Sequence, residues 1–224
     1  MRWVSIGSVG LGSLVASSCA SPTSVYTGNH KSNERKMMKK IPTLFVRDLE
    51  DRAHVTDEVT PGCEWVLAGK GVATRKYDGT CMMLDNNGDW WARREVKPGK
   101  AAPENYLVDN VDEVTGKTQG WEPVGQSPFA KFHAEATAGW FGWKAGTYEL
   151  VGPKVQGNPE KVKAHELILH DAAEVLQIAS YEIGFIKMFV SNLSKNGWEG
   201  IVWHHPDGRM AKLKARDLKG GHNE

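Results

Sequence analysis

The chain has 224 residues, of which 40% are hydrophobic and 25% are charged, and its formal net charge is +1. This composition suits one soluble globular domain, or at most two small ones, and no segment is long and apolar enough to span a membrane. The near-neutral charge argues against a nucleic-acid partner unless basic residues gather locally.

Basic residues do gather at three places along the chain. If the three clusters converge on one groove, they could contact phosphates, whereas each cluster by itself is more typical of a solvated surface. The clusters are Arg93, Arg94, Lys97 and Lys100; Lys154, Lys161 and Lys163; and Lys212, Lys214, Arg216 and Lys219.

The first forty residues differ in character from the rest. Residues 1–20 resemble a weak signal peptide, and Cys19 suggests a lipoprotein cleavage site that lacks the usual Leu three residues earlier. Met37-Met38, followed by two lysines, reads like the natural start of a protein. We therefore expect residues 1–36 to be a mis-called or disordered N-terminal extension and residues 37–224 to form the domain.

The cysteines indicate the redox compartment. Cys19, Cys63 and Cys81 form no C-x-x-C pair and no spacing typical of a metal site. This pattern gives no sign of a disulfide scaffold and favours a reducing cytoplasm.

The elements expected along the domain alternate between hairpins and a few helices. Asn87-Gly88 predicts a hairpin between strands at 80–84 and 89–96, and residues 98–128 are predicted to be long surface loops. Strands are predicted at 147–152 and 165–169, and a helix at 181–193. Residues 206–208 predict a second hairpin between 199–205 and 209–218. This mixture indicates an α+β fold.

The second hairpin allows its facing residues to be predicted. With Asp207-Gly208 as a two-residue loop, Trp203 faces Lys212, Ile201 faces Lys214 and Glu199 faces Arg216. Because side chains alternate along a strand, Glu199, Lys212 and Lys214 would share one face, which suits a nucleotide site. The alternative is that the two lysines simply line the wet face of an amphipathic strand.

The first hairpin carries two adjacent arginines. With Asn87-Gly88 as a two-residue loop, Arg93 faces Met82 and Arg94 faces Cys81. Adjacent residues point to opposite faces, so we expect only one of the two arginines to reach a ligand on that sheet. The sequence leaves open which one.

Residues 76–79 read Lys-x-Asp-Gly, at the end of one strand-like segment and just before another. A lysine in this setting can attack the α-phosphate of a nucleotide and form a covalent lysyl-nucleotide. The amine must first lose a proton, so its pKa must fall through desolvation or neighbouring positive charge. Lys212, Lys214, an arginine and a bound Mg²⁺ could supply that charge.

Five motifs follow one another in a fixed order, and together they are more specific than any one of them. In this order they resemble the nucleotidyltransferase superfamily of ATP-dependent ligases and capping enzymes, and most closely its small RNA ligases. The resemblance covers residues 41–218. The motifs are Lys76-x-Asp-Gly, Arg93-Arg94, Tyr148-Glu149-Leu150, Glu199-Gly200-Ile201-Val202 and Lys212-Leu213-Lys214.

The resemblance implies a fold and a reaction. The fold would be a nucleotidyltransferase domain, ATP-grasp-like, with antiparallel sheets and flanking helices. Lys76 would attack ATP to give lysyl-AMP, AMP would pass to the 5′-phosphate of an RNA end, and a 3′-hydroxyl would displace it. Mg²⁺ or Mn²⁺ would assist, RNA and ATP would be the partners, and no membrane would be involved.

The resemblance also assigns roles to the remaining motif residues. Asp78 and Gly79 would shape the nucleophile loop, and Arg93 or Arg94 would contact the nucleotide. Glu149 would bind the ribose or position the 5′ end, Glu199 would hold a hydrated metal ion, and Lys212 and Lys214 would grip the α-phosphate. In this family an aromatic residue often stacks on adenine from the strand predicted at 165–169, yet residues 165–170 contain no Phe or Tyr.

Several alternatives remain beside the RNA ligase. DNA ligases and GTP-dependent capping guanylyltransferases usually carry an OB-fold module after the Lys-x-Lys strand, and the ten residues after Lys214 leave no room for one. A catalytically silent RNA-end-binding module would use the basic clusters without forming an adduct. A surface lipoprotein is suggested only by the first twenty residues. Zinc binding by His204-His205 is disfavoured because adjacent strand residues diverge.

Overall fold

The computed structural model describes residues 40–219, so the expected extension at 1–36 lies outside the described residues. The strands are β1 (Phe45–Arg47), β2 (Val55–Val59), β3 (Val72–Lys76), β4 (Thr80–Leu84), β5 (Trp90–Val96), β6 (Leu107–Val111), β7 (Thr118–Pro123), β8 (Gly146–Val151), β9 (Glu166–Leu169), β10 (Val175–Leu176), β11 (Gly200–His204) and β12 (Met210–Lys214). The α-helices are α1 (Glu64–Leu67), α2 (Ala130–Thr137) and α3 (Ile183–Ser194), and short 3₁₀ helices are η1 (Val124–Gln126), η2 (His170–Ala172) and η3 (Ala215–Asp217).

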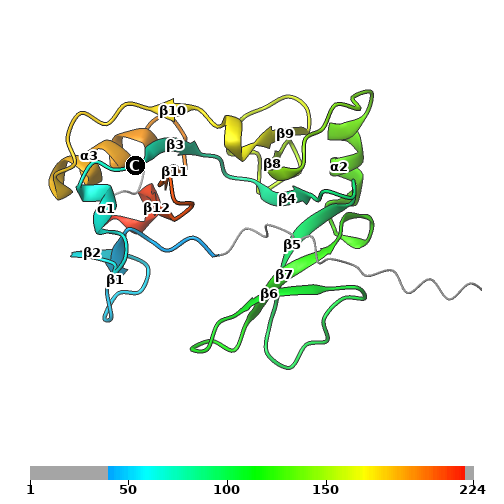
Figure 1. The fold of residues 1–224 in the computed structure, drawn as a ribbon, viewed down its shortest axis with the longest axis horizontal. Coiled ribbons are helices and arrows are strands. Elements are labelled where there is room, and N and C mark those ends of the chain that lie inside the picture. Colours follow the sequence, from blue (N-terminus) through cyan, green and yellow to red (C-terminus); the bar gives the residue numbers. More distant parts are fainter. Residues whose placement is uncertain (1–39, 220–224) are drawn as a thin grey trace, which may run out of the picture. The chain divides into compact units, whose positions relative to one another are not determined.

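The strands form three sheets in which neighbouring strands pair antiparallel (Figure 1). Strands β1 and β2 form a small sheet. A four-stranded sheet has the order β10-β3-β11-β12, and a six-stranded sheet has the order β6-β7-β5-β4-β8-β9. The expectation of a mixed fold with mainly antiparallel sheets and few helices is confirmed.

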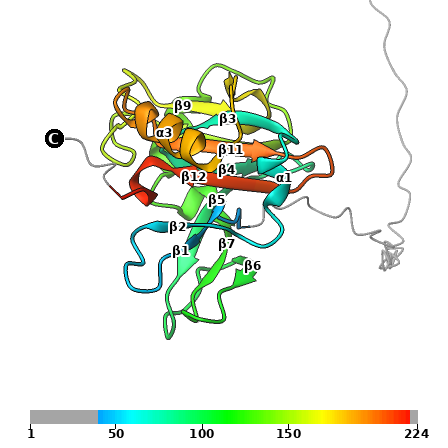
Figure 2. The same ribbon diagram turned by 90° about the vertical axis from the view of Figure 1, so that its left-hand side faces the viewer.

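Helix α3 covers one face of the four-stranded sheet, as the view onto this helix in Figure 2 shows. Its apolar residues recur at helical spacing, so Ile186 and Val190 fall on one side of the helix and are buried. They pack in one core with Ile201, Trp203 and Leu213, which alternate along β11 and β12. The polar residues between these positions therefore point to the opposite face of the sheet.

Helix α2 covers one face of the six-stranded sheet. Met82, Tyr148 and Leu150 lie on the face that packs against Phe129 and Phe132, at the start of the helix and within it. The residues that alternate with them, such as Glu149, point away from α2. Each of the two larger sheets thus has one face covered by a helix and one face left for other contacts.

Both predicted hairpins form, but each is shifted by one residue from the predicted register. The loops contain three residues, because Asp85 pairs with Asp89 and His205 with Arg209, with backbone N–H to O distances of 3.0 and 2.9 Å. The last loop residue is a glycine with positive φ in each case, +90° and +91°, which is typical of a three-residue loop. The predicted facing pairs are therefore wrong.

In the observed registers Val202 faces Lys212, Gly200 faces Lys214 and Leu84 faces Trp90.

The prediction of surface loops across residues 98–128 is wrong in part, because it missed two strands. This segment contains β6 and β7, and β7 lies between β5 and β6 in the sheet. Its anchor is Trp121, which is fully buried. Tertiary packing of one large side chain thus overrides a composition rich in turn-forming residues. The strands predicted at 147–152 and 165–169 and the helix predicted at 181–193 are confirmed with small shifts at their ends.

Cys63 and Cys81 are free thiols, and Cys19 lies outside the described residues. Between residues 40 and 219, no helix has the length and apolar character needed to cross a bilayer.

Candidate active site

The faces of the two larger sheets that point away from α2 and α3 line a cavity with a volume of about 960 Å³. The chain passes from β3 directly into β4, and so from one sheet to the other, through residues 77–79 (Figure 1). Lys76 is the last residue of β3, so the Lys-x-Asp-Gly motif lies where the sheets are joined. Of the predicted site residues, four line the cavity directly: Lys76, Arg93, Glu149 and Lys212.

Glu199 joins two of the predicted lysines. One carboxylate oxygen of Glu199 accepts a hydrogen bond from the Nζ of Lys76, and the other accepts one from the Nζ of Lys214. Strand β11 explains this geometry, because its first residue, Gly200, faces Lys76 on one side and Lys214 on the other. A Cβ on Gly200 would come within 2.1 Å of the Leu213 carbonyl oxygen, so the strands need glycine here.

The charges of this cluster set the protonation of Lys76. Burial alone would lower the pKa of Lys76, but the negative charges of Glu199 and Glu149 outweigh burial, and the pKa lies above its ordinary value. Burial would likewise raise the pKa of Glu199, but Lys76 and Lys214 hold it below its ordinary value. Lys76 is therefore a paired ammonium in this arrangement, and the lowered pKa expected at this lysine is not found.

Lys212 has the opposite character. Burial, together with the positive charges of Lys214 and Lys76, lowers the pKa of Lys212 from 10.5 to about 8. It lies on the cavity face of β12, opposite Val202. Unlike Lys76, Lys212 is therefore a cavity lysine whose ammonium form the fold disfavours.

Glu149 binds the loop that carries the Lys-x-Asp-Gly motif. Its Oε1 accepts a hydrogen bond from the backbone N–H of Gly79 at 3.1 Å, and its Oε2 lies 3.1 Å from the Nε2 of His170. The Nδ1 of His170 is 2.9 Å from the hydroxyl of Thr147. A Cβ on Gly79 would come within 2.2 Å of the Leu150 carbonyl oxygen, so the motif glycine permits this close approach.

The structure separates the two arginines. Arg93 lines the cavity, forms an ion pair with Asp109 at 2.8 Å and lies over the ring of Trp121. Arg94 does not line the cavity and lies 3.7 Å from the buried carboxylate of Glu122. Arg93 is thus the arginine that the fold brings to the other predicted residues.

Two carboxylates could hold a divalent cation. Asp78 and Glu199 are close enough for the charge of Glu199 to raise the pKa of Asp78, after the larger effect of burial. Mg²⁺ is commonly held by one or two carboxylates together with substrate phosphates and water, and Asp78 and Glu199 are carboxylates of this kind, although both oxygens of Glu199 are paired with lysines here. Among residues 40–219 there is no cluster of three or more His, Cys, Asp or Glu residues of the kind that holds a metal without substrate.

The adjacent histidines do not act together. The Nε2 of His204 is 3.0 Å from the hydroxyl of Thr74, whereas the Nδ1 of His205 is 2.8 Å from Asp207. The two side chains therefore have separate partners.

Sequence reasoning missed His170 as a residue of the cavity. It follows the strand β9 directly and begins η2, and both of its ring nitrogens are held by Thr147 and Glu149. Its ring lines the cavity together with that of Tyr77. The sequence did contain a clue to His170. It stands at the end of the strand predicted at 165–169, from which an aromatic residue is expected by the family resemblance.

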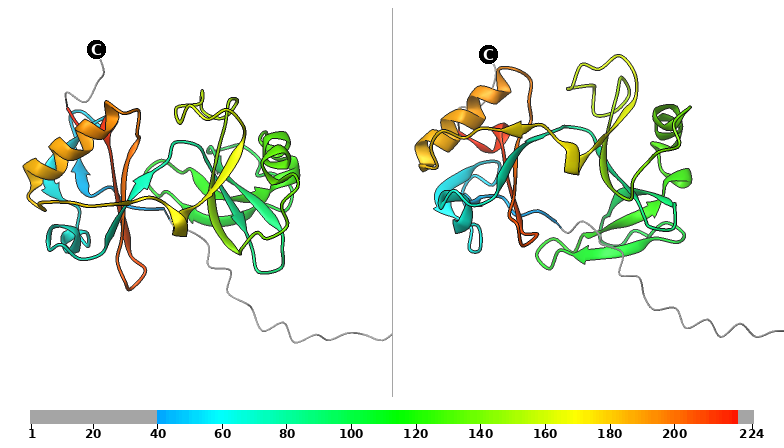
Figure 3. Two further views of the ribbon diagram at one scale, coloured as in Figure 1. Left: turned by 90° about the horizontal axis from the view of Figure 1, so that it is seen from above. Right: turned by 45° about the horizontal axis from the view of Figure 1, so that its top comes forward.

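Two kinds of exposed residue occur near the ends of β8. Trp140 and Phe141, with 60% and 96% of their surfaces exposed, lie in the segment that leads to Ala145 and Gly146 of the cavity lining. The connection from β8 to β9, the loop of yellow ribbon in Figure 3, carries the exposed lysines Lys154, Lys161 and Lys163.

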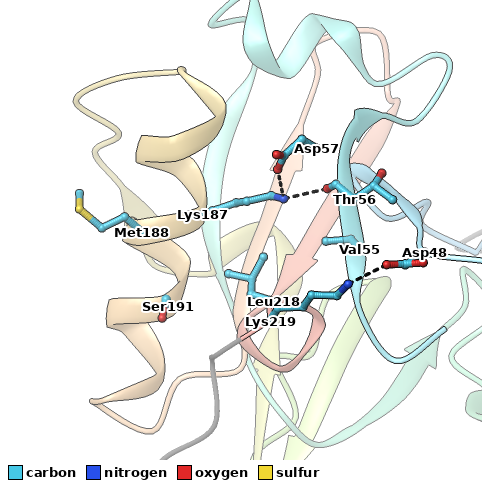
Figure 4. A pocket seen from close by; sticks show the side chains of 9 residues that line it. All are labelled: Asp48, Val55, Thr56, Asp57, Lys187, Met188, Ser191, Leu218 and Lys219. Atoms are coloured by element: carbon cyan, nitrogen blue, oxygen red, sulfur yellow. Dashed lines mark hydrogen bonds and ion pairs between the residues drawn. The ribbon is translucent and has the colours of Figure 1, made fainter. Parts of the chain in front are cut away.

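A second hollow of about 590 Å³ lies between β2 and α3 (Figure 4). Its lysines are already engaged, since Lys187 binds Asp57 and the Thr56 carbonyl oxygen, and Lys219 binds Asp48 at 2.8 Å. None of the predicted site residues lines this hollow. The cavity between the two larger sheets is therefore the better candidate.

Comparison with known proteins supports an RNA ligase. The chain is 23% identical to RNA ligase 1 of Danio rerio over 263 aligned positions that cover 81% of each chain. It is 32% identical to RNA ligase 1 of Pongo abelii over 77 residues, which cover 32% of this chain and 24% of that protein. No protein-family model matches the sequence.

Proposed function

We propose that this protein is an ATP-dependent RNA ligase that joins a 5′-phosphate end to a 3′-hydroxyl end through lysyl-AMP on Lys76, and that its fold is a nucleotidyltransferase domain. The observation that carries the proposal is the position of Lys76. It lies at the junction of two sheets, in a cavity, against Glu199, and Lys212 and Lys214 are on β12, on the far side of β11 from Lys76. The similarity to RNA ligase 1 supports the substrate class.

The first step needs an unprotonated amine at Lys76. Its nitrogen would bond to the α-phosphorus of ATP while the bond to pyrophosphate breaks, and the amine proton would leave. Because Glu199 now holds Lys76 as an ammonium, this ion pair must loosen before attack. Lys212 and Lys214 would offset charge on the phosphate oxygens, since phosphoryl transfer depends mainly on positioning and electrostatics.

A divalent cation, Mg²⁺ or Mn²⁺, held by Glu199 and Asp78, would supply further neutralisation of phosphate charge when bound. Arg93 would contact the nucleotide from the six-stranded sheet. His170 takes the place of the Phe or Tyr that residues 165–170 lack, because its two nitrogens are held and its ring lines the cavity. Its ring would stack on the adenine.

The later steps involve RNA. The 5′-phosphate oxygen would attack the phosphorus of lysyl-AMP and release Lys76, and the 3′-hydroxyl would then displace AMP. The exposed lysines of the β8–β9 connection would contact the RNA backbone. Trp140 and Phe141 would stack on unpaired bases close to the cavity, as aromatic residues do in proteins that bind single strands.

The test is incubation with α-labelled ATP and Mg²⁺, followed by denaturing electrophoresis and mass-spectrometric location of the adduct. We expect a stable AMP adduct on Lys76 in the parent and none in Lys76→Ala. An adduct on Lys212 would move the nucleophile to the lysine with the lowered pKa. If the protein is labelled by GTP but not by ATP, it is a capping guanylyltransferase. If it seals DNA but not RNA, it is a DNA ligase. If it forms no adduct with either nucleotide, a silent RNA-end-binding module remains.

A further inference from the structure

Glu160 links the long β8–β9 connection to the nucleophile loop. Its Oε2 accepts a hydrogen bond from the guanidinium of Arg75, and its Oε1 accepts one from the backbone N–H of Asp78 at 2.9 Å. Arg75 precedes Lys76, and Asp78 follows it by two residues. One carboxylate from a distant part of the chain therefore binds residues on both sides of the motif lysine, through the side chain of Arg75 and the backbone of Asp78.

The carboxylate is well shielded from water. Only 3% of the Glu160 side chain is exposed, so removing either of its partners would leave a buried charge with too few hydrogen bonds. Hydrogen bonds to an ionised carboxylate are about twice as strong as those between neutral groups. The link between Glu160 and the nucleophile loop is thus a strong and specific one.

Arg75 is held on its flat faces as well. Its guanidinium lies 4.6 Å from the ring centre of Tyr77 and 4.1 Å from that of Trp198. Trp198 directly precedes Glu199, which binds Lys76. The guanidinium of Arg75 thus lies between the rings of Tyr77 and Trp198 and links the end of β3 to the start of β11. Glu160 accepts a hydrogen bond from the same guanidinium.

The connection that carries Glu160 adopts costly backbone conformations. Gln156, Asn158 and Lys161 have φ of +47°, +59° and +55°, a region that residues with a Cβ rarely occupy. Such conformations persist only where the surroundings hold them, and here the fully buried Val155 anchors the loop. The chain maintains this strained path and delivers Glu160 to the nucleophile loop.

We infer that Glu160 is a positioning residue for lysyl-AMP formation, acting through Arg75 and the Asp78 backbone to set the place of Lys76. The inference rests on the proposed function. The physical reason is that attack on phosphorus tolerates little displacement: an error of about 1 Å can lower a rate about a hundredfold. Glu160 touches neither the nucleotide nor the reacting nitrogen in this role.

The test compares Glu160→Gln with Glu174→Gln. Both carboxylates lie beside Arg75, but Glu174 is 3.8 Å away with 52% of its side chain exposed. The amide of Gln has nearly the shape of Glu, yet its NH₂ group donates where the site needs an acceptor. At saturating ATP we expect Glu160→Gln to form lysyl-AMP about tenfold to a hundredfold more slowly with little change in KM. Glu174→Gln should stay within about twofold of the parent.

A second measurement separates positioning from a general loss of structure. With RNA that already carries AMP on its 5′-phosphate, the 3′-oxygen bonds to phosphorus, AMP leaves and the hydroxyl proton passes to water. Lys76 is not a reactant in this step, so Glu160→Gln should seal such RNA at close to the parent rate. Arg75→Lys, which keeps the charge but loses the planar fork, should show the same division between the two steps.

Each outcome has a distinct meaning. Equal lysyl-AMP rates in the parent and Glu160→Gln would overturn the inference while leaving the proposed function in place. Equal losses in lysyl-AMP formation and in sealing would make Glu160 a merely structural residue, which also overturns it. A parent protein that forms no lysyl-AMP would refute the proposed function itself, and the inference with it.

Discussion

At neutral pH, the ligand-free protein should be less stable to unfolding with Lys212 than with a neutral side chain at this position. Its pKa falls from 10.5 in the unfolded chain to about 8 in the fold, because of burial and then the charges of Lys214 and Lys76. The folded state therefore disfavours the ammonium form. At about 1.4 kcal/mol for each pKa unit, the difference corresponds to about 3 kcal/mol. Lys212→Gln should recover part of this, about 1–3 kcal/mol at pH 6.5.

The sign of the pH dependence follows from the same shift. Below pH 8 both the folded and the unfolded chain carry the proton on Lys212, so the full destabilisation is present. Between about 8 and 10.5 the folded chain has lost this proton and the unfolded chain has not. The advantage of Lys212→Gln should therefore shrink steadily as the pH rises through this range and vanish near 10.5.

Urea denaturation of the parent and Lys212→Gln at pH 6.5, 8 and 9.5 measures this difference directly, because groups common to both proteins cancel. Lys70→Gln, a change at an exposed lysine, serves as the control and should stay within about 0.5 kcal/mol of the parent at each pH. A Lys212→Gln protein that is less stable than the parent at pH 6.5, or whose advantage is the same at all three pH values, would refute the reasoning.

Three further changes have definite expected results. Glu199→Gln leaves two lysines without their carboxylate and should destabilise by about 3–5 kcal/mol at pH 7 in urea unfolding. Because the fold lowers the pKa of Glu199, this loss should be constant above its ordinary value of 4.5 and shrink as the pH falls through the lower folded value. Gly79→Ala should cost about 1–3 kcal/mol, since its Cβ would meet backbone, whereas Gly184→Ala has open space in α3 and should stabilise by a few tenths to about 1 kcal/mol; equal melting temperatures would contradict this. Joint replacement of Trp140 and Phe141 by Ala should weaken binding of single-stranded RNA about tenfold or more in fluorescence anisotropy yet leave lysyl-AMP formation intact, and unchanged affinity would rule out stacking there.

The hairpins illustrate how far the sequence could predict the site. Lys212 and Lys214 share a face in any register, because they are two residues apart on a strand. The grouping of Glu199 with Lys214 was predicted from a register that is wrong by one residue. It nevertheless forms, because Glu199 precedes the glycine that faces both Lys76 and Lys214. The glycine could not decide between a two-residue and a three-residue loop, because a positive φ at that residue suits both.

Long-range contacts explain most of what the sequence could not predict. Glu160 and Arg75 are 85 residues apart, and the short motif around Lys76 contains no sign of this partner. Strands β6 and β7 were hidden by turn-forming residues, and their pairing depends on the burial of Trp121 in the folded chain. Local periodicity sufficed for α3, where Ile186 and Val190 repeat at helical spacing.

The order of the strands also has a consequence for how the protein is made. The six-stranded sheet uses one continuous stretch, residues 80–169, whereas β3 must wait for β11, whose Gly200 pairs with Lys76. A ribosome therefore releases a chain that can complete the larger sheet well before it can complete the smaller one. We expect nascent chains that end before residue 199 to fold in part yet to form no AMP adduct, because Lys76 gains Glu199 and the β12 lysines only in the last stage of synthesis.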